Sequence, residues 1–126
     1  MNFFDAQTQL PALAKQLAAH DGLVVACYCA AWCDTCTQYR PAFEALAGRM
    51  PAHLFVWVDI EECEALLGDE DIENFPTLLL QSQAGNLFFG PLPPHAEHLE
   101  RLLRGAQNAG LQPLAGGPPL VAAAAQ

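Results

Sequence analysis

The sequence predicts one α/β domain in which helices flank both faces of a central mixed β-sheet of about four strands. Two short runs, 23–29 and 54–60, are apolar and rich in β-branched or aromatic residues, as buried strands are. An amphipathic stretch, 37–50, lies between them and predicts a βαβ unit with parallel strands. Turn residues separate two further strands, 77–81 and 87–89, which predicts a hairpin and the overall order βαβ then ββα.

Three further helices are expected around this core. The first begins near Thr8, with Pro11 tolerated in its opening turn, and its leucines and alanines recur at helical spacing on one face. An acidic stretch, 61–71, is expected to be helical after the second buried strand. The last helix, 94–107, again carries its leucines on one side.

The chain of 126 residues is predicted to form one domain over residues 1–109. A chain of this length buries about two-thirds of its unfolded surface, so it needs no structural disulfide to fold. Residues 110–126 are rich in Gly, Pro and Ala, and we expect them to form a mobile tail.

The charge balance narrows the possible partners. With 5 basic and 14 acidic residues the formal net charge is −9, which argues against binding nucleic acid or an anionic membrane. No apolar run approaches the ~20 residues of a membrane helix. The first residues carry no pattern of a secretory signal, so we expect a cytoplasmic protein, in which cysteines more often serve catalysis or metal binding than cross-linking.

One motif, Cys33-Asp34-Thr35-Cys36, lies where a buried strand passes into a helix. Free backbone N–H groups and the helix dipole stabilise negative charge at a helix N-terminus. A thiol in that position ionises more readily, and the thiolate is the form that attacks disulfides. The motif therefore indicates a dithiol that exchanges with disulfides.

The motif and its surroundings resemble the thioredoxin family. The resemblance rests on Trp32 directly before the motif, on Pro41 five residues after it, and on Phe75-Pro76-Thr77 leading into a strand. It covers residues 10–107 and implies a thiol–disulfide oxidoreductase with a thioredoxin-like fold and no bound cofactor. It also implies a cis peptide bond before Pro76, with this proline lying against the dithiol.

The resemblance implies a role for each matching residue. Cys33 would be the exposed attacking thiolate and Cys36 the buried resolving thiol, so the redox-active disulfide would be Cys33–Cys36. Trp32, Phe75 and Pro76 would bind the substrate, with the backbone of Phe75 pairing with an extended segment. The expected partners are proteins with disulfides and a reducing dithiol protein, and we expect a monomer that works in the reducing direction.

Three positions depart from the family pattern and would tune the motif. Asp34 opposes the thiolate of Cys33 by charge repulsion, whereas Thr35 can donate a hydrogen bond to sulfur. Cys27 stands where the family buries an aspartate that helps to move the proton of the resolving cysteine. A thiol is a poorer base near neutral pH, so resolution is expected to be slower or to use water.

Two other functions stay open. Cys27 and Cys29 share one face of the predicted strand, and we interpret them as small hydrophobes, with a second redox pair or metal ligands as alternatives. If that face lies under the motif, Cys33 and Cys36 complete a set of four sulfurs that could bind zinc or copper(I). Alternatively, the chain is a non-catalytic docking domain. Cys63 is expected to be structural or incidental.

Overall fold

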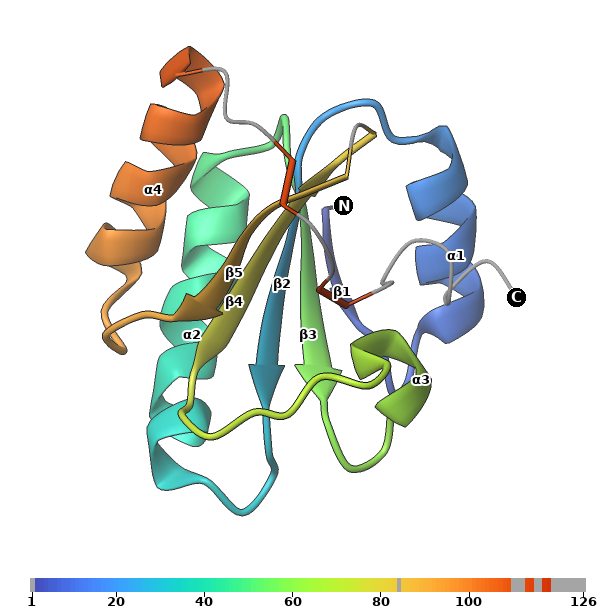
Figure 1. The fold of residues 1–126 in the computed structure, drawn as a ribbon, viewed down its shortest axis with the longest axis vertical. Coiled ribbons are helices and arrows are strands. Elements are labelled where there is room, and N and C mark those ends of the chain that lie inside the picture. Colours follow the sequence, from blue (N-terminus) through green and yellow to red (C-terminus); the bar gives the residue numbers. More distant parts are fainter. Residues whose placement is uncertain (1, 84, 110–112, 115–116, 119–126) are drawn as a thin grey trace.

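The computed structural model describes residues 2–83, 85–109, 113–114 and 117–118, and Figure 1 shows their arrangement. Helices lie on both sides of a central sheet, as the sequence predicts. In chain order the elements are β1 (Phe3–Asp5), α1 (Leu10–Ala19), β2 (Val24–Cys29), α2 (Asp34–Arg49), β3 (Leu54–Asp59), α3 (Glu64–Leu67), β4 (Thr77–Ser82), β5 (Gly85–Pro91) and α4 (Ala96–Ala109).

The sheet has five strands in the order β1-β3-β2-β4-β5. Strands β2 and β3 run parallel on either side of α2 in the chain, which confirms the βαβ unit, and β4 and β5 form the antiparallel hairpin. The expected count of about four is one too low, because the three residues of β1 pair in parallel with β3. In the sequence, residues 2–4 are the candidate for this first strand, but so short a segment carries too little alternation to be counted with the others.

Alternation along the strands divides the interior into two cores. Every residue of β2 and β3 is buried, because both faces are covered. On one face Cys27, Cys29 and Trp57 pack with α2 and α4. On the other face Tyr28 and Val58 pack with α1 and the single turn of α3. The side chains of both strand cysteines therefore lie on the face that α2 covers.

Two helix predictions need correction. The first helix has Gln9 at its N-cap in place of Thr8, while Pro11 lies in its first turn as expected. The acidic stretch 61–71 forms only the turn Glu64–Leu67, which ends at Gly68 with φ 70°. Glycine adopts this conformation without steric cost, so the chain turns away there. The helix predicted over 94–107 occurs as Ala96–Ala109.

Side chains from separate elements hold β1 against α2. The amide nitrogen of Asn2 donates to the carbonyls of Ala47, Met50 and His53 at 2.8, 3.2 and 3.0 Å. These contacts join Asn2 to the last turn of α2, to its C-cap residue Met50 and to the residue just before β3. Arg40, on the same helix, forms a 2.8 Å ion pair with Asp5.

The predicted mobile tail falls mostly outside the described residues. Four of its residues are described, and they lie against β5. The N–H of Leu114 donates to the carbonyl of Asn86 at 2.6 Å, and the side-chain amide of Asn86 donates to the carbonyl of Pro118 at 3.1 Å.

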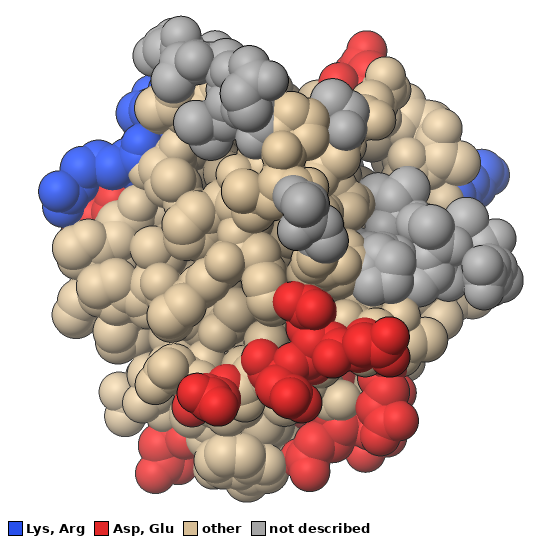
Figure 2. Space-filling model, in the orientation of Figure 1, with Lys and Arg blue, Asp and Glu red and all other residues tan. Residues whose placement is uncertain are grey.

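Acidic side chains gather around α3 and the adjoining loops, at the lower end of the face in Figure 2. The segment 59–73 holds eight of the 14 acidic residues and no basic residue. Among the described residues, no helix is long and apolar enough to cross a membrane.

His53 makes the stability of the fold depend on pH. It is buried, and neither ring nitrogen has a hydrogen-bond partner among the residues that the structure describes. Burial, with a smaller contribution from His20, lowers the pKa of His53 below its usual value of 6.5. The unfolded chain therefore takes up the proton first as the pH falls, and stability drops below about pH 6.5.

We expect the free energy of unfolding to decrease as the pH falls below about 6.5, by at most about 1.4 kcal/mol per pH unit for this one proton. Urea unfolding of the wild type and of His53→Leu across this range measures the effect. The variant should lack this drop, and the matched change His95→Leu at an exposed position should retain it. Equal pH profiles for the wild type and His53→Leu would contradict the assignment to His53.

Candidate redox site

The cysteine motif lies at the start of α2, as the sequence predicts. Cys33 is the N-cap residue, and its N–H donates to the carbonyl of Ala30 at 3.1 Å. Its carbonyl accepts from the N–H and the hydroxyl of Thr37, at 3.1 and 3.2 Å. Asp34 and Thr35 form the first turn of the helix. The free thiol of Cys33 is partly exposed, whereas Cys36 is 1% exposed.

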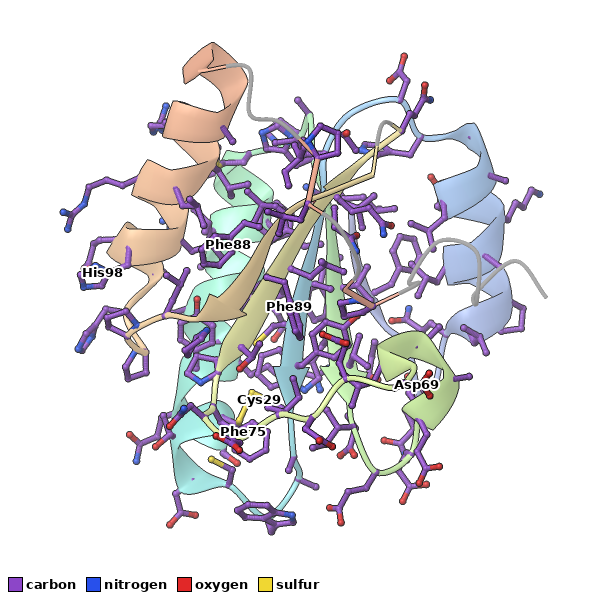
Figure 3. All side chains as sticks on the ribbon, viewed as in Figure 1. Cys29, Asp69, Phe75, Phe88, Phe89 and His98 are labelled. Carbon is purple, nitrogen blue, oxygen red and sulfur yellow. A yellow bond between two sulfur atoms is a disulfide. The ribbon has the colours of Figure 1, made fainter. Side chains whose placement is uncertain are left out.

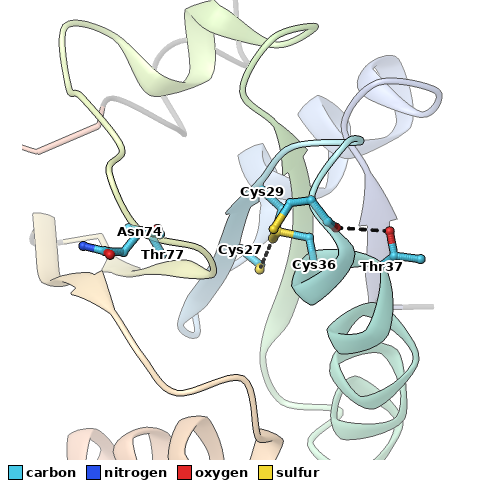
Figure 4. Close-up of a disulfide and its surroundings, with 7 residues drawn as sticks. Cys27, Cys29, Cys36, Thr37, Asn74 and Thr77 are labelled. Atoms are coloured by element: carbon cyan, nitrogen blue, oxygen red, sulfur yellow. Dashed lines mark hydrogen bonds between the residues drawn. A yellow bond between two sulfur atoms is a disulfide. The ribbon is translucent and has the colours of Figure 1, made fainter.

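The disulfide of the structure joins Cys29 to Cys36, with their Cα atoms 5.8 Å apart. Figure 4 shows this bond between the end of β2 and the first turn of α2. The sequence predicts a different disulfide, between Cys33 and Cys36. It also treats Cys29 as a small hydrophobe, and the structure corrects that interpretation. The C-x-x-C spacing of Cys33 and Cys36 is easy to recognise in a sequence. The contact between Cys29 and Cys36 is not, because it depends on how β2 packs against α2.

Cys27 lies next to this disulfide on the same face of β2. Its Sγ is 3.7 Å from the Sγ of Cys29, and its side chain is fully buried. Burial raises the pKa of the Cys27 thiol well above its ordinary value. Cys27 is therefore a neutral thiol near pH 7, and it cannot replace a buried carboxylate as a base.

An apolar surface lies beside the motif. Trp32 is 67% exposed, and its ring meets the ring of Phe75 edge to face, with centroids 5.5 Å apart. Phe75 lies at the same end of the sheet as Cys29 (Figure 3) and packs against the core that contains the disulfide. The bond between Phe75 and the buried Pro76 is cis. The structure thus brings together Trp32 and Phe75, two of the predicted substrate-binding residues.

The backbone of Phe75 is available for pairing with a partner. Within the described part of the chain, neither its N–H nor its carbonyl has a hydrogen-bond partner. Hydrogen bonds hold the neighbouring residues in place. The hydroxyl of Thr77 donates to the carbonyl of Asn74 at 2.6 Å. The N–H of Leu92 donates to the carbonyl of Pro76 at 3.3 Å.

A pocket that sequence reasoning missed reaches Cys36 from the side of β3. Asp5, Arg40, Trp57 and Asp59 are among the residues that line it with Cys36. The guanidinium of Arg40 lies over the ring of Trp57, 5.4 Å from its centroid. One oxygen of Asp59 accepts hydrogen bonds from the N–H groups of the next turn. The pocket thus places the carboxyl-bearing residues Asp5 and Asp59 on the side of Cys36 that faces β3.

Cys63 is the N-cap residue of α3 and takes no part in the disulfide. Burial raises the pKa of its thiol, and the charges of Asp59 and Asp5 raise it further. Among the described residues, no group of three or more His, Cys, Asp or Glu side chains is placed to hold a metal ion.

The Thioredoxin family model matches residues 6–90, which include the motif, the cis-proline and the strands between them. The chain belongs to the thioredoxin family. Mouse thioredoxin is 33% identical over 60 residues, and human thioredoxin is 32% identical over 60 residues. Each of these two matches covers 48% of this chain and 57% of the relative. The chain thus spans little more than half the length of these thioredoxins.

Solved structures confirm the thioredoxin fold. A poplar thioredoxin h, 17% identical, superimposes with a TM-score of 0.71 over 86% of this chain and 98% of its own. A thioredoxin from Fasciola hepatica, 22% identical, has a TM-score of 0.64 over 82% of this chain and 97% of its own. The predicted fold class is therefore correct apart from the additional strand β1.

Proposed function

We propose that this thioredoxin-family chain is a thiol–disulfide oxidoreductase that reduces disulfides in protein substrates. The observation that carries the proposal is the cysteine geometry. A partly exposed thiol at a helix N-terminus, Cys33, lies next to a buried cysteine that is engaged in a disulfide, Cys36. The exposed pair of Trp32 and Phe75 beside it supports docking of a protein substrate.

The proposed reaction has two exchanges. The thiolate of Cys33 attacks one sulfur of a substrate disulfide, the substrate's S–S bond breaks, and its other sulfur leaves as a thiolate. The thiolate of Cys36 then attacks Cys33, the mixed disulfide breaks, and the reduced substrate leaves. The oxidised pair needs two electrons from a reducing dithiol partner before the next cycle. Reduction as the physiological direction implies a reducing compartment such as the cytoplasm.

In the second exchange Cys36 must lose its proton. Cys27 is unsuited to accept it, because burial raises the pKa of its own thiol. The pocket lined by Cys36, Asp5 and Asp59 supports transfer to solvent or to a carboxylate on the side of β3. This route agrees with the sequence-based expectation that resolution uses water.

Partner binding follows from the same surface. The free N–H and carbonyl of Phe75 suit an extended substrate segment that pairs as an added strand. A solved complex of thioredoxin f2 with ferredoxin:thioredoxin reductase supports a reductase as the electron donor for this fold. Asp34 and Thr35, in the first turn of α2, would tune the potential of the pair.

Reduction of insulin with dithiothreitol as the electron source tests the proposed function. We expect the wild type to accelerate insulin precipitation, and Cys33→Ser and Cys36→Ser to lower the rate to that of dithiothreitol alone. The matched control Cys63→Ser should retain the wild-type rate, because Cys63 belongs neither to the motif nor to the disulfide. A wild-type rate equal to the dithiothreitol background would reject the enzyme and favour a docking domain.

A further inference from the structure

Cys36 can take part in two different disulfides. Its motif partner Cys33 is the N-cap residue of α2 and packs partly buried against the core that contains Cys36. Its partner in the structure is Cys29, at the end of β2, with a Cα–Cα separation of 5.8 Å. This separation lies in the range that a disulfide requires. One buried sulfur therefore stands between an accessible thiol on one side and a buried thiol on the other.

The two possible partners of Cys36 differ in their access to solvent. Cys29 and Cys36 are each 1% exposed, so the Cys29–Cys36 disulfide is screened from other molecules. Cys33 is partly exposed and lies next to Trp32. A protein or small thiol that meets the site must therefore react first at Cys33.

We propose that Cys29 is a third redox-active cysteine, which displaces Cys33 from Cys36 after each oxidation. This inference rests on the proposed function, which supplies the Cys33–Cys36 disulfide. The thiolate of Cys29 attacks the Sγ of Cys36, the Cys29–Cys36 bond forms, and the Cys33–Cys36 bond breaks. Cys33 leaves as a thiolate, and the proton from Cys29 passes to it or to solvent. One disulfide replaces another, so the chain neither gains nor loses electrons.

The interchange changes what the site can do. With Cys36 bound to Cys29, the exposed Cys33 is again a free thiol and can attack a second disulfide. Cys36 is then unavailable to resolve the mixed disulfide, so its release needs an external low-molecular-weight thiol. With the buried Cys29–Cys36 bond in place, the chain remains oxidised by two electrons. Only Cys33 is then available for exchange, so a site that works with two thiols becomes a site that works with one.

Peptide mapping of the oxidised full-length chain tests the interchange. The reduced protein is mixed with oxidised glutathione, quenched in acid at intervals, alkylated with N-ethylmaleimide and cleaved with chymotrypsin. Cleavage after Tyr28, Trp32 and Tyr39 separates Cys29 from the motif, since the products are residues 29–32 and 33–39. A Cys33–Cys36 bond then lies within one peptide, whereas Cys29–Cys36 joins two peptides and leaves Cys33 alkylated.

We expect the internal Cys33–Cys36 peptide early and its replacement by the cross-linked pair as the major final product. Persistence of Cys33–Cys36 with alkylated Cys29 would overturn the proposal. The matched control Cys27→Ala removes the neighbouring buried thiol and should give the wild-type products. The proposal requires Cys33 to react first. It would therefore also be overturned if the Cys29–Cys36 bond formed as fast in Cys33→Ser as in the wild type. Because glutathione is the oxidant, these results do not depend on insulin reduction, and wild-type mapping needs no variant to fold.

Discussion

Dithiothreitol is expected to reduce the Cys29–Cys36 disulfide of Cys33→Ser at least about a hundred-fold more slowly than that of the wild type. In the wild type, Cys33 can attack Cys36 from within the site and carry the disulfide to the surface. In the variant the reductant must reach sulfurs that are 1% exposed. A hundred-fold slowing corresponds to a local opening free energy of roughly 3 kcal/mol, within the range of sub-global openings in folded domains.

Acid-quenched alkylation over a time course of dithiothreitol reduction measures both rates. The control is the same variant in guanidinium chloride, where unfolding exposes the disulfide and reduction should proceed at the ordinary rate. Cys63→Ser provides a second control, since it also removes one free thiol but leaves Cys33 in place. Equal rates for native Cys33→Ser and the wild type would show that the buried bond is accessible without Cys33.

Replacement of Phe43 by alanine is expected to lower the free energy of unfolding by about 3 to 5 kcal/mol. Phe43 is fully buried where α2 crosses the sheet. Its ring centroid lies 5.4 Å from that of Phe55, 5.7 Å from that of Trp57 and 6.1 Å from that of Tyr39. The ring therefore joins α2, and with it Cys36, to β3. Domains have a total stability of about 5 to 15 kcal/mol, so the loss is a large part of it.

Urea unfolding of the wild type and Phe43→Ala measures this cost. The matched control is Phe3→Ala, because Phe3 contacts the same ring, with centroids 6.0 Å apart, but is only half-buried. Its loss should be clearly smaller, since solvent already reaches part of its ring. A cost of less than about 1 kcal/mol for Phe43→Ala would mean that the core closes over the space, and the cluster would not anchor α2.

Local patterns in the sequence predict most of the fold. The buried runs that become β2 and β3 are short, apolar and β-branched, and the amphipathic stretch between them becomes α2, so the parallel unit follows from connection rules. Predictions were incomplete for β1 and wrong for the acidic helix, because local signals were weak there. The strand Phe3–Asp5 is held by pairing with β3 and by Asn2, and the acidic stretch 61–71 is helical only over one turn. Neither outcome follows from periodicity.

The candidate site was also predicted only in part from the sequence. Sequence spacing identifies the motif at the start of a helix, and the resemblance points to Trp32 and Phe75, which the structure brings into contact. The roles of Cys33 and Cys36 in exchange stay predictions that the insulin assay tests. The pocket that contains Cys36 and Asp59 could not be predicted, because its walls come from elements far apart in the chain.

By itself the sequence determined the fold class, the family and the position of a cysteine pair at a helix N-terminus, since each is encoded mainly in local sequence patterns. Only the tertiary structure decided which sulfur Cys36 contacts. Cys29 reaches it because the face of β2 that carries the strand cysteines lies under the first turn of α2. Side chains seven residues apart, on two different elements, meet through packing of helix on sheet, and no spacing rule within one element describes that contact.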